Sequence, residues 1–211
     1  LTNTIQDTNI SAPNKKVGKV RDAYFLNDKV VMISTDRQSA FDRVLAAIPY
    51  KGAVLNSVSA WWFKKTEHLF PNHLISTPDP NVSIVEKCTV FPVEFVVRGY
   101  ITGTTDTSLW TVYNNGDREY CGNSLPEVLK KNDKLDKPML TPTTKDKVHD
   151  RPVSREEIID LGLMSAEDYD IAAKMSLDLF AFGQETAKKN GLILVDTKYE
   201  IGTDSSGKIK L

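Results

Sequence analysis

The sequence is poor in cysteine and histidine. It contains two cysteines, Cys88 and Cys121, and no Cys-x-x-Cys pair. A disulfide-stabilised fold needs a larger set, so we interpret both as reduced thiols of a cytosolic protein. The three histidines form no His-x-x-x-His or His-Glu-x-x-His pair. A zinc site built on such a pair is therefore not expected.

The sequence also lacks an excess of charge of either sign and any long apolar run. Lys and Arg total 27 against 28 Asp and Glu, a formal net charge of −1. This balance disfavours a general nucleic-acid-binding protein, which needs a basic excess. The longest apolar runs, residues 30–33 and 192–195, have the length of a strand. No transmembrane helix is therefore expected.

The two ends of the chain bear on its cellular location. The first 14 residues lack the basic start and apolar middle of a secretion signal, so a cytoplasmic protein is expected. Because the chain begins with Leu1 and not with Met, a plastid location is kept for the case that a transit peptide preceded it. The chain stops at Leu211 inside an expected strand, whereas ends are usually polar and frayed. We therefore expect the C-terminal end to be missing.

What is present is typical of a globular protein. Of the 211 residues, 40% are hydrophobic and 26% are charged, which is enough for one large domain or two small lobes. Asn27-Asp28 is a two-residue turn signal and predicts a hairpin over 17–35. Apolar spacing predicts a helix over 54–69 and strands over 82–101. Polar residues 1–14 are expected to form a loose arm, and 36–52 and 71–80 are expected to form loops.

Helices followed by a hairpin are predicted in the second half. Ser154 with Glu157, and Ser165 with Asp168, have the spacing of helix N-caps. A short helix is expected at 124–127 and a long polar loop at 133–152. Further expected elements are a strand over 192–199, a turn over 204–207 and a strand over 208–211. Strands dominate the first half and helices the second, so the predicted fold class is α+β with antiparallel sheet.

Two segments of the first half could carry chemistry, and the first of them could bind a triphosphate. In Gly18-Lys19-Val20-Arg21-Asp22, a glycine permits close backbone approach and two cations would offset phosphate charge. A solvated strand face explains the same residues. The segment from Asp36 to Asp42 combines two carboxylates, the Ser39 hydroxyl and a guanidinium. A turn in which Asp and Ser cap the backbone is the alternative.

A third candidate is Arg98, which ends an apolar strand that begins near Phe91. Its planar guanidinium suits a phosphate or a carboxylate. In the loop that follows, Gly103 allows backbone N–H groups to approach an anion, and the Thr104 hydroxyl can donate. An arginine paired with a structural carboxylate is the alternative.

The last strand supplies a fourth candidate. Asp196, Lys198 and Glu200 alternate in sequence, so all three project from one face of a strand. Such a face is costly to bury in a core. It suits an ATP site in which carboxylates hold Mg²⁺ and the lysine contacts an anionic substrate. A solvated sheet face is the alternative. Elsewhere, Thr141 to Lys145 with His149-Asp150 form a polar segment in which no Ser or Cys has the spacing of a nucleophile triad.

Together these motifs resemble the two signatures of the SAICAR synthetase family, the phosphoribosylaminoimidazole-succinocarboxamide synthases of purine biosynthesis. Residues 90–94, Arg98 and 102–104 match the first signature, with Thr104 in place of Ser. Residues 196–202 match the second, with Ile201 in place of Phe. The likeness spans residues 17–211. The family continues into an Asp-Glu pair and an Arg-containing segment, thought to bind Mg²⁺ and a substrate phosphate, that these 211 residues do not contain.

The resemblance implies an ATP-dependent ligase of de novo purine biosynthesis. Such an enzyme condenses CAIR, a carboxylated aminoimidazole ribonucleotide, with L-aspartate to give SAICAR through an acyl phosphate. ATP and Mg²⁺ are the implied cofactors, and no nucleic-acid or membrane partner is expected. The implied fold is two-lobed, with an antiparallel lobe over residues 1–97, a larger lobe over 98–211 and an ATP cleft between them. The oligomeric state stays open.

The family's ligand-binding residues are carried over by position. Those implied at ATP are Gly18, Lys19, Arg21, Phe91 and Glu94. Those implied at CAIR are Arg98, Thr104 and Lys198, with Asp36, Ser39 and Asp42 at the substrate cleft. Lys198, Asp196 and Arg98 form the implied catalytic group, in which Asp196 supports the other two. Glu200 is the implied Mg²⁺ ligand. Lys145, His149 and Asp150 are implied on a loop that closes the site.

Two other interpretations remain. A kinase-like phosphotransferase would use the same glycine-containing hairpin and metal carboxylate, but it needs a catalytic Asp-and-Asn loop that the sequence does not show. A truncated nucleotide-binding remnant without turnover is the non-enzymatic alternative.

Overall fold

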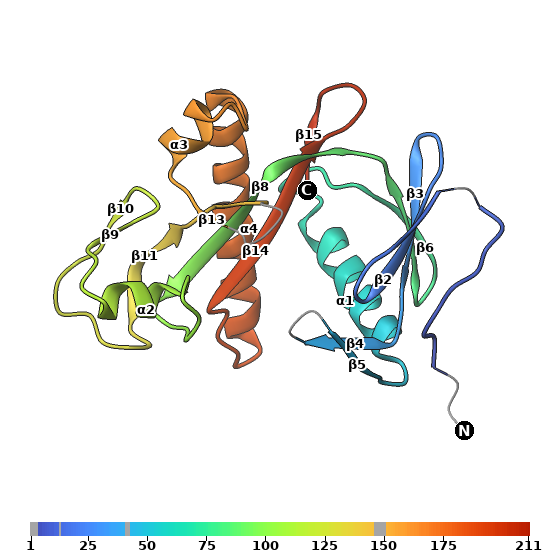
Figure 1. Ribbon diagram of the computed structural model, residues 1–211, viewed down its shortest axis with the longest axis horizontal. Helices are drawn as coiled ribbons and strands as arrows, with labels where there is room; N and C mark the ends of the chain where they lie inside the picture. The colour runs from blue at the N-terminus through green and yellow to red at the C-terminus, as the bar shows by residue number, and fades with distance from the viewer. Residues whose placement is uncertain (1–3, 13, 41–42, 146–150) are drawn as a thin grey trace. The chain divides into compact units, whose positions relative to one another are not determined.

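The computed structural model describes residues 4–12, 14–40, 43–145 and 151–211, and it divides into two compact units (Figure 1). The first comprises Leu1–Thr89 with Asp204–Lys210, and the second comprises Val90–Thr203 with Leu211. The division falls at the start of β8 (Thr89–Tyr100), earlier in the chain than the expected boundary near residue 97. The assignment of either unit to ATP stays a prediction.

A five-stranded antiparallel sheet with the order β1-β2-β3-β7-β6 forms the first unit. Its strands are β1 (Lys15–Val17), β2 (Arg21–Phe25), β3 (Lys29–Ser34), β6 (Leu74–Asp79) and β7 (Val82–Glu86). The hairpin predicted at Asn27-Asp28 is confirmed, since Leu26 N–H donates to the Lys29 carbonyl at 2.9 Å. The loop predicted over 71–80 is wrong: Pro78 lies in β6, where an edge strand tolerates a residue without an N–H.

Helix α1 (Lys51–Thr66) contacts β3, β6 and β7 and confirms the predicted helix, although it begins earlier. It buries a polar side. The Asn56 amide donates to the Pro80 carbonyl at 3.0 Å and accepts from Ser83 Oγ at 2.7 Å. A β-carbon on Gly52 would lie 2.2 Å from the Ser34 carbonyl oxygen, so only glycine allows this approach of helix to strand. Apolar Val54, Leu55, Val58 and Trp61 are exposed instead.

One strand pair of the first unit lies where a loop was expected, and the strand expected over 208–211 is confirmed at residues 209–210. β4 (Arg37–Ala40) pairs with β5 (Arg43–Ala47) in a two-stranded sheet within 36–52, and β15 is Ile209–Lys210. The expected loose arm is tied down, because Ile5 N–H donates to Asp36 Oδ2 at 2.9 Å and Arg37 Nη1 donates to the Gln6 carbonyl. These contacts are distant in sequence, so local patterns did not indicate them.

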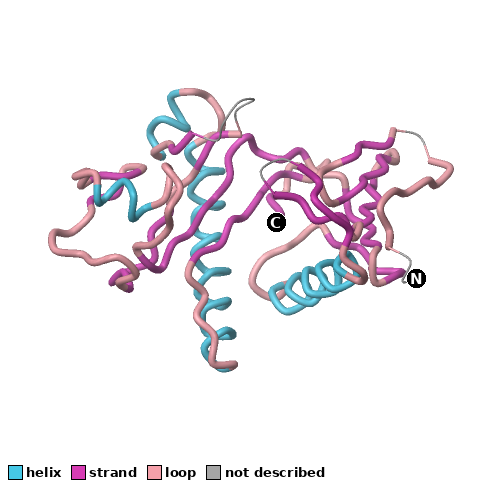
Figure 2. Tube along the Cα trace, turned by 60° about the horizontal axis from the view of Figure 1, so that its bottom comes forward, coloured by secondary structure: helices cyan, strands magenta, loops and turns pink. Residues whose placement is uncertain are grey.

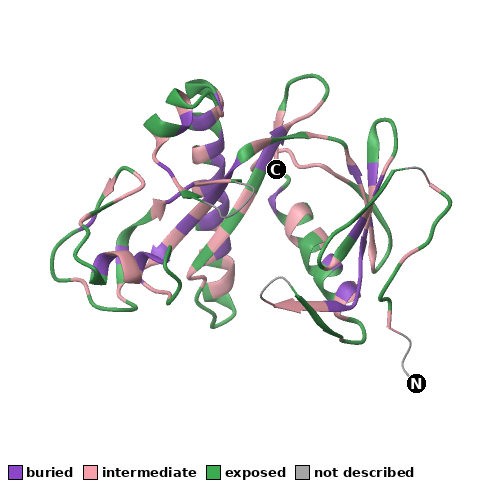
Figure 3. Cartoon of the chain, in the orientation of Figure 1, coloured by how far each residue is buried: buried purple, intermediate pink, exposed green. Residues whose placement is uncertain are grey.

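The second unit is organised around β8, which pairs with β11 and β12 and neighbours β14 in the sheet order β13-β12-β8-β14. Its elements are α2 (Leu109–Asn114), β9 (Glu119–Tyr120), β10 (Asn123–Ser124), β11 (Lys134–Leu140), β12 (Thr143–Thr144), β13 (Arg151–Pro152), α3 (Arg155–Asp160), α4 (Ala166–Lys189) and β14 (Asp196–Thr203). Helix α4 contacts β14 and β11, and the strands cross it obliquely (Figure 2). Val93, Phe95 and Val97 are fully buried on the face of β8 that meets α4, where Phe95 contacts Tyr169. Figure 3 shows the buried parts of the chain concentrated on the central strands and helices.

The helix starts predicted from capping residues are confirmed at two positions. Ser154 and Glu157 form the predicted capping box of α3, and Ser165 Oγ accepts from Asp168 N–H at 3.0 Å at the start of α4. The helix predicted at 124–127 is wrong: Ser124 pairs in β10, and Val128 has a left-handed φ of 63°.

Two further predictions in this unit are corrected. The loop predicted over 133–152 contains β11, β12 and β13, whose strands are short or irregular and therefore show no period; the register of β11 against β8 shifts between Lys134 and Met139. The strand predicted from Leu192 begins at Asp196, because Leu192 N–H closes the end of α4 on the Ala187 carbonyl. Within the described residues, no helix has the length and apolar character needed to cross a membrane.

Candidate functional site

The three charged residues of the last long strand share one face of β14. Asp196, Lys198 and Glu200 are exposed, and Thr197 and Tyr199 between them are half-buried. This is the alternation expected of a strand. Because β8 neighbours β14 in the sheet, residues of β8 that project to the same side can reach these charges.

Glu94 of β8 does so. Its side chain is 9% exposed and its Oε2 lies 2.8 Å from Lys198 Nζ. Its carboxyl group also lies beside that of Glu200. Lys145, which follows β12, places Nζ 2.8 Å from Glu200 Oε2. Two ammonium groups therefore compensate two adjacent carboxylates, in the order Lys145, Glu200, Glu94, Lys198.

The lysines keep Glu200 ionised. Burial alone raises the pKa of this carboxyl, but the hydrogen bond and charge of Lys145 and the charge of Lys198 together outweigh burial. The pKa of Glu200 therefore lies below its ordinary value, and the group is a carboxylate at neutral pH. A half-exposed carboxylate in this state can accept a cation from solution.

Arg98 lies on the same face of β8 as Glu94, since the two positions are an even number of residues apart. Its Nε donates to Thr141 Oγ1 at 2.9 Å. Its Nη1 lies 4.0 Å from Asp196 Oδ2, and its Nη2 lies 3.5 Å from the Thr107 carbonyl. Arg98, Lys198, Asp196, Glu200 and Glu94 thus form one charged face, which we call the β8–β14 face.

Gly103 shapes the loop that follows Arg98. Its φ of +106° is a conformation that residues with a side chain rarely adopt, and a β-carbon there would lie 2.3 Å from Ser108 Cβ. Ser108 caps α2, accepting from Thr111 N–H. Thr104, beside Gly103, is exposed. Thr104 is therefore accessible to solvent, and its ligand-binding role stays a prediction.

Gly18, Lys19 and Arg21 lie at the connection between β1 and β2, where all three are exposed. Gly18 N–H donates to the Arg21 carbonyl at 2.7 Å. The guanidinium of Arg37 donates to the carbonyls of Gly18 and Lys19 at 2.9 and 3.2 Å. Arg37 thus fixes the backbone of this connection, while Lys19 and Arg21 remain exposed. This arrangement suits a phosphorylated ligand.

Asp36 has a structural role instead. It is 3% exposed, and its carboxylate accepts from the backbone N–H groups of Ile5 and Gly52, both at 2.9 Å. The second contact caps α1, whose own N-cap residue Tyr50 makes no side-chain cap. These contacts favour the alternative of a backbone-capping Asp. Ser39 is half-buried in β4, and Asp42, His149 and Asp150 lie outside the described residues.

Phe91 and Glu94 are both implied at ATP by the resemblance, but they project from opposite faces of β8. Phe91 lies on the side of Val93 and Phe95, which meets α4, whereas Glu94 points to Lys198. Sequence reasoning therefore missed the ionic role of Glu94 and the contact of Thr141 with Arg98. The only signal was the polar composition of the Thr141–Lys145 segment.

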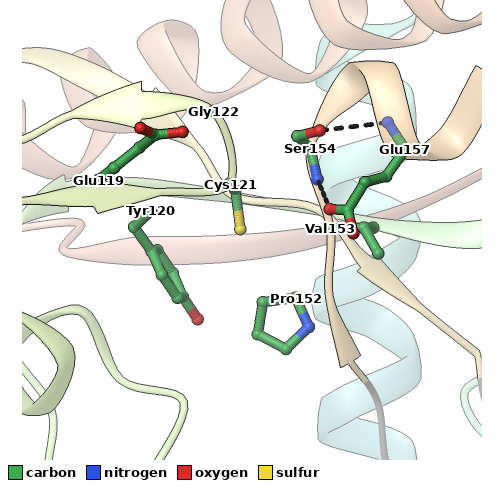
Figure 4. Close-up of a pocket in the computed structure, with 8 residues that line it drawn as sticks. All are labelled: Glu119, Tyr120, Cys121, Gly122, Pro152, Val153, Ser154 and Glu157. Atoms are coloured by element: carbon green, nitrogen blue, oxygen red, sulfur yellow. Dashed lines mark hydrogen bonds between the residues drawn. The ribbon is translucent and has the colours of Figure 1, made fainter. Parts of the chain in front are cut away.

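A separate hollow of about 580 Å³ lies in the second unit, lined by Glu119, Tyr120, Cys121, Gly122, Pro152, Val153, Ser154 and Glu157 (Figure 4). Burial raises the pKa of the Cys121 thiol to about 12, so it stays protonated and is no nucleophile. The described lining residues include two carboxylates and no Lys or Arg, which does not suit an anionic substrate. None of the predicted site residues lies there.

For a metal ion, the β8–β14 face offers a small donor set. No three His, Cys, Asp or Glu side chains among the described residues come together as a metal site. Mg²⁺ in nucleotide enzymes usually takes one or two carboxylates and completes its shell with water and phosphate oxygens. Glu200, with Glu94 beside it, fits this smaller requirement.

Comparison with known proteins gives a consistent result. The family model described as SAICAR synthetase matches residues 14–211. The phosphoribosylaminoimidazole-succinocarboxamide synthase of Legionella pneumophila (strain Lens) is 57% identical over 207 residues, which are 98% of this chain and 66% of that protein. The chain spans 63% and 53% of the corresponding proteins of Vigna aconitifolia and Arabidopsis thaliana, both named as chloroplastic. It thus spans less than two thirds of the length of these relatives.

Solved structures agree in fold. The SAICAR-synthase from Saccharomyces cerevisiae complexed with SAICAR has a TM-score of 0.84 at 29% identity, covering 98% of this chain and 75% of that one. A type-2 SAICAR synthetase in complex with ADP has a TM-score of 0.76 at 27% identity, covering 94% and 78%. The family model matches nearly the whole of this chain, and the solved structures share its α+β fold. This chain therefore belongs to the SAICAR synthetase family.

Proposed function

We propose that this chain carries the anion- and cation-binding face of an ATP-dependent ligase that condenses CAIR with L-aspartate to SAICAR, releasing ADP and phosphate. The observation that carries the proposal is the β8–β14 face itself, where Arg98 and Lys198 lie among the carboxylates Asp196, Glu94 and Glu200. Family membership supports it. Two related structures are named as complexes with SAICAR and with ADP, which supports a purine-precursor nucleotide and ATP as ligands.

The chemistry requires such a face. A carboxylate does not accept an amine directly, so an oxygen of the CAIR carboxylate first attacks the γ-phosphorus of ATP, and ADP leaves. The aspartate amine then attacks the carbonyl carbon of this acyl phosphate, loses a proton and displaces phosphate. Charge accumulates on phosphoryl oxygens in both steps, so the protein contributes mainly by positioning the reactants and neutralising that charge.

Each residue has a role that its contacts support. Arg98, Thr104 and Lys198 bind the phosphate or carboxylate of CAIR, and Asp196 supports them as a nearby carboxylate. Lys198 already faces a carboxylate, Glu94, at 2.8 Å, so the ammonium is held where a second carboxylate could meet it. In the first unit, the exposed Gly18, Lys19 and Arg21 contact the ATP phosphates.

Mg²⁺ would be held by Glu200, with Glu94 adjacent, and would offset charge on the triphosphate when bound. Lys145 pairs with Glu200 at 2.8 Å and holds the carboxylate ionised for the cation. A cytoplasmic or plastid location stays a prediction, the second being supported by the names of the plant relatives.

The test is ADP release by the full-length protein with each substrate omitted in turn. The proposal expects release only when CAIR, L-aspartate, ATP and Mg²⁺ are all present, together with SAICAR by mass spectrometry. ADP release that ignores aspartate, with a phosphorylated product, would support the kinase-like alternative. ATP binding without any turnover would support the remnant.

A further inference from the structure

Arg98 is held by one close hydrogen bond and is otherwise loosely contacted. Its Nε donates to Thr141 Oγ1 at 2.9 Å. The contacts of Nη2 with the Thr107 carbonyl and of Nη1 with Asp196 are longer, at 3.5 and 4.0 Å. A guanidinium is a rigid plane, so fixing Nε fixes the direction of both terminal nitrogens. Those nitrogens form the edge that binds a phosphate or carboxylate in a bidentate manner.

Thr141 is itself immobile. It is 1% exposed, and its N–H donates to the Val96 carbonyl at 2.8 Å. Its hydroxyl donates to the same carbonyl at 3.4 Å. Because the hydroxyl proton is directed at Val96, the oxygen is free to accept from Arg98. Val96 lies in β8 two positions before Arg98, so the strand that carries the arginine also orients the group that holds it.

We infer that Thr141 is the positioning residue of Arg98, aligning the guanidinium for an anionic group of the nucleotide substrate. The inference rests on the proposed function, which places CAIR at Arg98. Without the hydroxyl, the Nε–H of a side chain that is 15% exposed loses its acceptor and the guanidinium must turn or take up water. Thr141 touches no reacting atom in this account and acts through Arg98 alone.

The experiment compares Thr141→Val, which keeps the shape and removes the hydroxyl, with Thr141→Ser, which keeps the hydroxyl. Thr66→Val is the matched control, because Thr66 is also buried and its hydroxyl also donates to a carbonyl, that of Trp62 at 2.8 Å, away from any arginine. In the full-length protein we expect Thr141→Val to raise KM for CAIR about tenfold with KM for ATP unchanged. Thr141→Ser should restore it, and Thr66→Val should leave both KM values unchanged.

A double-mutant cycle with Arg98→Ala separates positioning from general structural loss. Once Arg98 is absent, Thr141→Val should produce no further loss of CAIR binding, measured by calorimetry. Additive losses in the cycle would overturn the inference. So would an unchanged KM for CAIR in Thr141→Val when Arg98→Ala does not bind CAIR. Either result leaves the proposed function standing. If the wild-type protein neither binds nor converts CAIR, the proposed function fails and the inference with it. Should Thr141→Val unfold, Thr141→Ala carries the same cycle.

Discussion

The carboxylate of Asp22 and the guanidinium of Arg37 form an enclosed ion pair in the first unit, with Oδ1 and Nη2 2.7 Å apart. Asp22 has no exposed surface, and its second oxygen accepts from Thr8 Oγ1 at 2.6 Å and lies 3.2 Å from Lys15 Nζ. The same arginine donates to the carbonyls of Gly18 and Lys19. The pair therefore connects the interior of the sheet to the exposed connection proposed to bind phosphate.

Replacing Asp22 should destabilise the first unit strongly. Asp22→Asn leaves the Arg37 charge buried without a counter-charge, and breaking a buried pair costs about 3–5 kcal/mol. Denaturant unfolding of the variant measures this loss. The control is Asp170→Asn, which removes an equally close but exposed pair with Arg155, and a much smaller change is expected there. Equal losses in both variants would show that enclosure of Asp22 does not matter.

The same pair predicts how stability depends on pH. Burial raises the pKa of Asp22, but the hydrogen bonds from Arg37, Thr8 and Lys15 outweigh burial, so the pKa lies below the ordinary value for Asp. A group whose pKa is lowered on folding contributes stability that is complete above the unfolded pKa, near 3.9, and is lost as the pH falls through the folded pKa. In the wild type we expect the free energy of unfolding to decrease as the pH is lowered from about 4. In Asp22→Asn it should fall less steeply over that range.

Gly103 and Gly116 allow backbone strain to be separated from steric overlap. Their φ angles are +106° and +104°, but a β-carbon on Gly103 would lie 2.3 Å from Ser108 Cβ, whereas one on Gly116 would have no neighbour within 4 Å. Both Gly→Ala variants incur the strain, and only Gly103→Ala adds the overlap. We expect Gly103→Ala to be about 1–3 kcal/mol less stable than Gly116→Ala in thermal unfolding. Similar losses would mean that the loop relaxes around the added methyl.

The sequence predicted the elements whose signals are local. Asn27-Asp28 makes its turn, and Ser154 and Ser165 begin their helices, because each signal acts within a few residues. Ser124 and Glu127 have the same spacing as Ser154 and Glu157, yet they form no helix. Pairing of Ser124 with Glu119 and the left-handed backbone at Val128 decide the outcome there. A capping pattern therefore does not suffice to start a helix.

At the site, alternation predicted which charges share a face of β14 but not which partner each one meets. Thr141 lies 43 positions from Arg98 along the chain, and the Glu94 that pairs with Lys198 comes from another strand. Such pairs follow from strand register, and no local pattern encodes it. The apolar run after α4 misled for the opposite reason: Leu192 and Ile193 are exposed because the helix end sets the backbone there.

Glu94 and Glu200 are adjacent carboxylates for which we expect different roles. Glu94 is 9% exposed and bound to Lys198, so it fixes an ammonium and has little surface for a metal ion. Glu200 is half-exposed and can accept a cation. Under the proposed function, Glu94→Gln should raise KM for CAIR about tenfold at unchanged Mg²⁺ dependence. Glu200→Gln should instead raise the Mg²⁺ concentration needed for half-maximal ADP release.

Steady-state kinetics at varied CAIR and varied Mg²⁺ distinguish the two roles, with Glu185→Gln, a change on α4 outside the charged face, as the control. Each substitution keeps the shape of the side chain and removes one negative charge, so a difference between the two must come from position. Calorimetry of Mg²⁺ binding in the presence of ADP adds a readout that needs no turnover. If Glu94→Gln weakens Mg²⁺ binding as much as Glu200→Gln does, the two carboxylates form one shared metal site, and Lys198 must be positioned by Asp196 or by the substrate itself.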